Sequence, residues 1–155
     1  MKTRAIDQGK RQKPFEFCRE LFRLTMGGGA VFWLTTIATS LLPVAARYRA
    51  AFSNWSIQAV WIGSLLVGMI IGCCVSYSLL RFQAKIPAKD PILKAVILSA
   101  FMLVIALALV DAPMIFRGSG DALYYFLIGV VFNITRFLFL GIAIGCLHKS
   151  RQIWL

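Results

Sequence analysis

Arg136 is the residue in this sequence whose chemistry most needs an explanation, because it lies inside an apolar run long enough to cross a membrane. The run covers residues 122–147 and also contains the amide of Asn133, one helical turn before the arginine. A guanidinium group stays charged at physiological pH and offers five hydrogen-bond donors. Placing it near the middle of a bilayer costs about 2.5–3.5 kcal/mol, so we expect the side chain to face the interior of a helix bundle.

Three kinds of partner are able to satisfy Arg136 in such a bundle. The first is a set of oxygen atoms of the same chain, supplied by Asn133 and by the threonines that we expect at similar depth, Thr35, Thr36 and Thr39. The second is an anionic ligand or substrate, and the third is an acidic residue of a partner protein. The acidic residues near the predicted spans, Asp90, Asp111 and Asp121, lie at the membrane boundaries rather than at the depth of the arginine.

Catalytic chemistry is not indicated, so we expect a protein that is not an enzyme and has no catalytic residues, cofactor or metal site. A proton relay needs carboxylates at mid-membrane, and a haem site needs histidines within the spans, whereas His148 is predicted at the membrane interface. Adjacent Cys73 and Cys74 point about 100° apart on a helix and form no Cys-x-x-Cys pair. For the cysteines, including Cys18 and Cys146, packing or lipidation is the simpler interpretation.

Composition places the chain in the membrane class. Of its 155 residues 59% are apolar and the mean hydropathy is +0.77, against about 45–50% apolar residues in soluble domains. The 17 Lys and Arg outnumber the 6 Asp and Glu, but they lie between and outside the apolar runs. We therefore read the basicity as a signal of membrane topology and not as a nucleic-acid interface.

The predicted fold is an all-α integral membrane protein with four transmembrane helices in a compact bundle. Each apolar run reaches roughly the 20 residues that cross a bilayer core. The predicted spans are residues 24–46, 56–80, 92–112 and 122–147, and together they make one transmembrane domain, 24–147. Residues 148–155 are predicted as a short cytoplasmic tail.

Residues 1–23 are predicted as a basic cytoplasmic tail with an amphipathic segment. From Pro14, apolar residues recur at helical spacing opposite Glu16, Arg19, Glu20 and Arg23. This pattern fits a short amphipathic helix lying on the membrane surface, and it fits equally well an extension of the first spanning helix.

The distribution of positive charge predicts that both termini are cytoplasmic. Thirteen Lys and Arg fall on the side of the termini, three on the opposite side, and the remaining one is Arg136. The basic residues would then contact an anionic inner leaflet, in a bacterial or archaeal plasma membrane as the default.

Small residues predict where helices pack closely. In the second run Ser64, Gly68, Gly72 and Ser76 recur every four residues, which lets a neighbouring helix approach, and we favour a helix of the same chain over a second copy. Gly141 and Gly145 repeat this spacing in the fourth run. Gly27, Gly28 and Gly29 permit either a bend or a close approach, and we read them as a hinge.

Two functional hypotheses follow. In the first, the protein is an interaction, assembly or accessory subunit that packs within the membrane and docks a partner's carboxylate on Arg136. In the second, it is a small transporter or channel for an anionic or neutral solute, with Arg136 and Asn133 along the path; four spans are few for a monomeric carrier, so this version implies a homo-oligomer. A cavity that reaches Arg136 would favour the second.

Overall fold

The structure, a computed structural model, describes residues 14–52, 56–82, 86, 88, 90–111 and 122–153. Its helices are α1 (Pro14–Ser40), α2 (Pro43–Phe52), α3 (Ile57–Phe82), α4 (Pro91–Ala106) continued by the π-helical turn η1 (Leu107–Asp111), and α6 (Ala122–Ile153). The described residues contain no strand. The predicted all-α class is confirmed, and α1, α3, α4 and α6 are each long and apolar enough to span a membrane.

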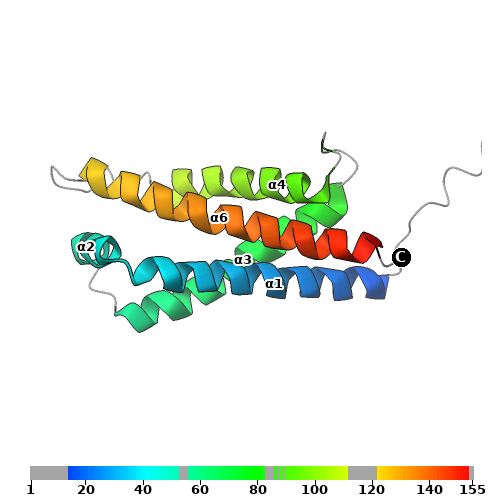
Figure 1. The fold of residues 1–155 in the computed structure, drawn as a ribbon, viewed down its shortest axis with the longest axis horizontal. Helices are drawn as coiled ribbons and strands as arrows, with labels where there is room; N and C mark the ends of the chain where they lie inside the picture. The colour runs from blue at the N-terminus through cyan, green and yellow to red at the C-terminus, as the bar shows by residue number, and fades with distance from the viewer. Residues whose placement is uncertain are drawn as a thin grey trace, which may run out of the picture.

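The four long helices run roughly antiparallel to their sequence neighbours, and the short α2 lies across one end of the bundle (Figure 1). We call this end the α2 end and the opposite one, where α1 begins and α6 finishes, the termini end. The most extensive contacts join α1 to α3, α4 to α6 and α1 to α6, so α1 and α6 form the central pair. The first 13 residues of the predicted tail and residues 154–155 lie outside the described residues.

The helix α1 differs at both ends from the first predicted span, residues 24–46. At one end α1 already starts at Pro14, a residue that the first helical turn accepts. Phe17 stacks edge-on against Tyr77 of α3 at 6.2 Å between ring centroids, so this segment is part of the bundle and not a separate surface helix. At the other end α1 stops at Ser40, because Pro43 has no N–H and its ring opposes helical geometry in the residue before it.

Pro43 then opens α2, which covers the end of the first predicted span and most of the loop predicted after it. The α-helical part of the third span ends before the predicted residue 112, because α4 ends at Ala106 and the chain continues as the π-helical turn η1. The helix α6 continues to Ile153 and so runs on into the tail that was predicted from residue 148.

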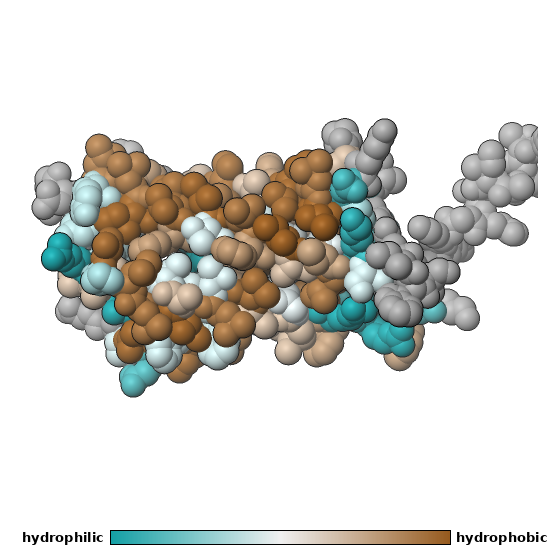
Figure 2. Space-filling view, in the orientation of Figure 1, coloured by the Kyte–Doolittle hydropathy of each residue, from teal (hydrophilic) through white to brown (hydrophobic). Residues whose placement is uncertain are grey.

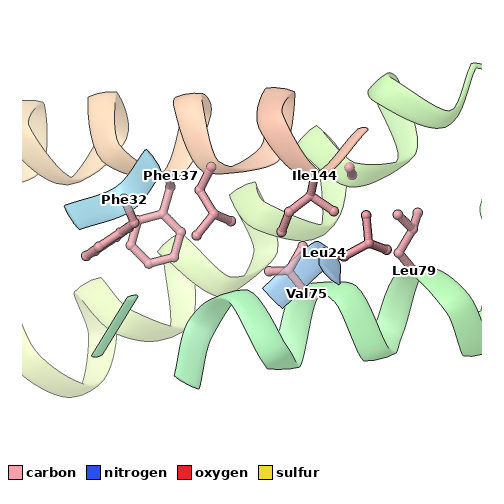
Figure 3. Packing of buried hydrophobic residues seen from close by; sticks show 8 residues of the cluster. Leu24, Phe32, Val75, Leu79, Phe137 and Ile144 are labelled. Atoms are coloured by element: carbon pink, nitrogen blue, oxygen red, sulfur yellow. The ribbon is translucent and has the colours of Figure 1, made fainter. Parts of the chain in front are cut away.

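The core lies where α1, α3, α4 and α6 face one another (Figure 3). Phe32 and Phe137 meet edge to face with ring centroids 5.7 Å apart, which ties α1 to α6. Towards the termini end the cluster continues through Leu24, Val75, Leu79, Ala95, Leu140 and Ile144. Around this core most of the long helices' surface is apolar, and the space-filling view shows a broad brown region with teal surface at its ends (Figure 2). The described helices thus fit a multi-pass integral membrane protein.

Candidate functional site

Arg136 lies on the side of α6 that faces the end of α1. Its Nη2 donates a hydrogen bond to Thr39 Oγ1 at 3.3 Å. The Thr39 hydroxyl in turn donates to the backbone carbonyl of Thr35 at 2.9 Å, with Thr36 O at 3.1 Å, so its lone pairs are turned towards the arginine. Thr39 therefore holds the guanidinium group in place from the last turn of α1.

Arg136 also lines a cavity of about 150 Å³ at the α2 end, and we call it the arginine cavity. A single water needs roughly 10–15 Å³ of such space, so the cavity has room for a small ligand. Its described walls come from α1, α2, α3 and α6, and the described lining residues are Ser40, Ala45, Tyr48, Arg49, Val60, Gly129, Phe132, Asn133 and Arg136. Two of these side chains are positively charged and none is acidic.

Arg49 is the second guanidinium group of the cavity, and its position follows from the break at Pro43. Because α2 turns across the end of the bundle, its residues 45, 48 and 49 share one helical face that points to α6. Arg49 is partly buried, its Nη1 is fully buried, and within the described part of the chain this atom has no hydrogen-bond partner. A buried donor of this kind is costly unless a ligand satisfies it.

The wall on α6 is a stripe at helical spacing, since Gly129, Phe132, Asn133 and Arg136 follow one another at intervals of three and one. Tyr48 of α2 packs against this stripe. A methyl group on Gly129 would lie 3.0 Å from the Tyr48 hydroxyl oxygen, and the Tyr48 ring stacks edge-on to Phe132 at 6.4 Å. The missing side chain of Gly129 is what lets α2 approach α6 so closely.

Two tryptophans hold α1 against α3 beside Ser40 of the cavity lining. Trp61 Nε1 donates to Ser40 Oγ at 3.0 Å, and Trp33 Nε1 donates to the backbone carbonyl of Trp61 at 3.0 Å. Ser40 Oγ itself donates a hydrogen bond to the Ile37 carbonyl oxygen at 2.8 Å. The Ser40 hydroxyl therefore helps to hold α1 against α3, and its one hydrogen-bond donor is already used within α1.

No family model, curated protein or solved structure matches this chain. A function must therefore be argued from the arginine cavity and its surroundings.

The structure brings together part of the polar site that the sequence predicted. Asn133 lines the same cavity as Arg136, and Thr39 bonds to the arginine. The hydroxyls of Thr35 and Thr36 instead donate to carbonyls of their own helix, those of Val31 and Phe32, at 2.7 and 2.9 Å. Only the threonine nearest the end of α1 reaches the depth of Arg136.

The small-residue stripe of α3 packs against α1 of the same chain. A methyl group on Gly68 would lie 3.2 Å from the Gly29 carbonyl, and one on Gly72 would lie 3.2 Å from the Thr25 carbonyl. Ser76 is fully buried, while Ser64 donates to the carbonyl of Trp61. Gly141 and Gly145 of α6 pack against α4 in the same way, where they lie against Val96 and Ile92.

The three glycines of α1 lie at contacts between helices. Gly27 and Gly28 face Leu147 and Ile144 of α6, while Gly29 faces Met69 of α3. The helix runs through them without interruption from Pro14 to Ser40. The structure therefore uses them for close approach, and a hinge motion stays a prediction.

Sequence reasoning missed two features. Arg49 was counted only as a charge on the far side of the membrane, although its spacing from Pro43 marks it as part of a second helix. Glu20 was assigned to an exposed polar face, and His148 to the interface. Instead the His148 Nδ1 and Glu20 Oε1 atoms lie 3.0 Å apart, with side chains only 6% and 4% exposed. This pair joins α1 to α6 at the termini end.

Proposed function

We propose that this protein is a small membrane transporter for a solute that carries an anionic group, and that the arginine cavity binds that group. The observation that supports the proposal is that two guanidinium groups, Arg49 and Arg136, line one cavity whose described lining residues include no acid, and that the buried Nη1 of Arg49 has no hydrogen-bond partner among the described residues. In the low dielectric of a membrane protein, such paired positive charge is best satisfied by a bound anion.

The surroundings of the two arginines suit this role. Asn133 adds an amide able to donate to a carboxylate or a phosphate, and Tyr48 adds a hydroxyl. The apolar walls, which include Val60 and Phe132, keep the local dielectric low and so strengthen the attraction. Four spans leave little room for a complete path through one chain, so we propose that the transporter is a homo-oligomer.

For its location we propose a bacterial or archaeal plasma membrane with both termini in the cytoplasm. The termini end holds the start of α1 and the end of α6, and the positive charge of the sequence is concentrated on that side.

The test is anion uptake by the purified protein in liposomes, with radiolabelled phosphate, sulfate and acetate as probes. We expect the wild type to take up at least one of them faster than empty liposomes, and Arg136→Gln to lower that rate at least tenfold. Arg47→Gln is the matched control, because Arg47 is exposed on α2 and does not line the cavity. Equal rates for wild type and Arg136→Gln would refute the proposal.

A second candidate is the interaction subunit, in which an acidic side chain of a partner protein enters the same cavity. The positive charge of the cavity supports this candidate. The small-residue stripe does not support it, because α1 of the same chain already covers Gly68 and Gly72. A membrane partner that co-purifies in equal amount with the tagged wild type, and is lost with Arg136→Leu, would favour this candidate over transport.

A further inference from the structure

We infer that a pocket between α1 and α6 at the termini end binds the phosphate of one anionic phospholipid, and that an acyl chain of this lipid lies along the exposed face of α1. This inference goes beyond the proposed function, because it concerns a different site and does not depend on the arginine cavity.

The pocket has a volume of about 40 Å³, and we call it the termini-end pocket. Its described lining residues are Arg19, Glu20, Arg23 and Leu24 of α1 and Leu147 of α6. A single water needs roughly 10–15 Å³ of such space, so the pocket has room for about one phosphate group and not for a whole head group. The lining combines charged and apolar side chains, which suits the part of a phospholipid where the phosphate joins the acyl chains.

Arg19 and Arg23 supply the positive charge of the termini-end pocket. They lie four residues apart on α1, so they project from one face of the helix, and both are exposed. Within the described residues neither of them forms an ion pair. Glu20, the acidic residue of the described lining, is buried, and its Oε1 lies 3.0 Å from His148 Nδ1. Two guanidinium groups are therefore within reach of a phosphate, which arginine binds through two parallel hydrogen bonds.

The two arginines lie at the depth of the phospholipid head groups. Arg23 lies 17 residues before Ser40, which ends α1, and this length of α-helix spans about 26 Å. The hydrocarbon core of a bilayer is about 30 Å thick, so Arg23 lies near its boundary and Arg19 lies about 6 Å further out. Basic pockets between spanning helices at this depth bind anionic lipid head groups.

An apolar track leads from the arginines towards the middle of the membrane. Met26, Ala30 and Leu34 follow Arg23 at intervals of three and four residues and share its exposed face of α1. Leu34 lies 11 residues beyond Arg23, about 16 Å along the helix. This is about half the thickness of the hydrocarbon core, which is the depth that one acyl chain fills. A lipid held by its phosphate thus has an apolar surface of matching length for its chain.

The experiment measures, by native mass spectrometry, how tightly the purified full-length protein in neutral detergent binds its first lipid. The probes are phosphatidylglycerol, which carries one negative charge, and phosphatidylcholine with the same acyl chains, which is neutral overall. We expect phosphatidylglycerol to bind at least tenfold more tightly, with one molecule per chain saturating the preference. Equal affinities would overturn the inference, and this comparison on the wild type needs no variant.

Variants separate one defined site from a general attraction between basic residues and anionic lipid. Arg19→Gln/Arg23→Gln removes both charges of the termini-end pocket, so we expect the preference for phosphatidylglycerol to disappear. Arg81→Gln/Lys149→Gln is the matched control, because it removes two exposed positive charges near the same end of the bundle but outside the described lining (Figure 1). This control should keep the preference within twofold of the wild type.

The inference is overturned if the control loses as much of the preference as the pocket variant does, or if the pocket variant keeps it. Far-UV circular dichroism and gel filtration verify that each variant is folded.

The contact with the acyl chain is tested by competition with glycerophosphoglycerol, which has the same phosphodiester and no chain. We expect a hundredfold excess of it to leave phosphatidylglycerol bound. Displacement would mean that the pocket takes a soluble phosphate ester, and the lipid inference would fall. Anion uptake succeeds or fails independently of these results, because the arginine cavity and the termini-end pocket lie at opposite ends of the bundle.

Discussion

The close approach of α4 to α6 at Gly145 gives a stability prediction whose size follows from the structure. A Cβ atom added at Gly145 would lie 2.5 Å from Ile92 Cα and 3.2 Å from Ile92 Cβ. Carbon atoms in contact lie about 3.5–4.0 Å apart, so Gly145→Ala requires the two helices to separate by about 1 Å. Because the obstructing atom belongs to the backbone, a change of rotamer cannot relieve it.

Overpacking of this kind costs about 1–3 kcal/mol, whereas replacing glycine by alanine in a helix gains about 1 kcal/mol. The control that removes the second effect is Gly63→Ala in α3, because a Cβ there would meet nothing within 4 Å. We therefore expect Gly145→Ala to be less stable than Gly63→Ala by about 1–3 kcal/mol, with Gly63→Ala at or slightly above the wild type.

The assay is unfolding by SDS in mixed micelles, followed through tryptophan fluorescence. Trp33 and Trp61 are suitable reporters, because their indole N–H groups bond across the α1–α3 contact. A midpoint for Gly145→Ala equal to that of Gly63→Ala would mean that α4 and α6 are not held as closely as the structure has them, and the packing argument would be refuted.

Three further predictions concern other parts of the bundle. Glu20→Gln should lower the free energy of unfolding by about 1–3 kcal/mol in the same assay, because it weakens the buried contact with His148. Thr39→Val removes the hydroxyl that accepts from Arg136, so we expect the rate of anion uptake in liposomes to fall about tenfold, equivalent to about 1.4 kcal/mol. In a variant that keeps Cys18 as its single cysteine, a membrane-impermeant maleimide should label inverted vesicles and leave right-side-out vesicles unlabelled, because Cys18 is exposed near the proposed cytoplasmic end.

The first two of these predictions have matched control variants. Glu16→Gln alters an exposed carboxylate on the same helix and should not change stability. Thr35→Val removes a hydroxyl that bonds within α1 and should not change the rate of anion uptake. Labelling of Cys18 in right-side-out vesicles would reverse the proposed topology. An undiminished rate of uptake in Thr39→Val would mean that Thr39 does not position Arg136.

The sequence alone was sufficient for the class of the fold and the number of long helices. Apolar runs of about 20 residues have few alternatives to a membrane-spanning helix, because an unsatisfied backbone is too costly in lipid. The same logic singled out Arg136, since a charge inside such a run needs a partner, and it placed Asn133 on the same face one turn away. Small residues every four positions likewise indicated close packing, which the structure shows at Gly68 and Gly72.

Only the tertiary structure decided which groups meet. Hydropathy counts apolar residues and is insensitive to a single backbone break, so the turn at Pro43 was passed over, and with it the placement of Arg49 in the cavity of Arg136. Glu20 and His148 lie 128 positions apart, and neither lies inside an apolar run that would mark it as buried. Their contact depends on how far α1 and α6 extend beyond the predicted spans and on how the two helices pack. No local pattern in the sequence encodes the separation between two residues that lie on different helices.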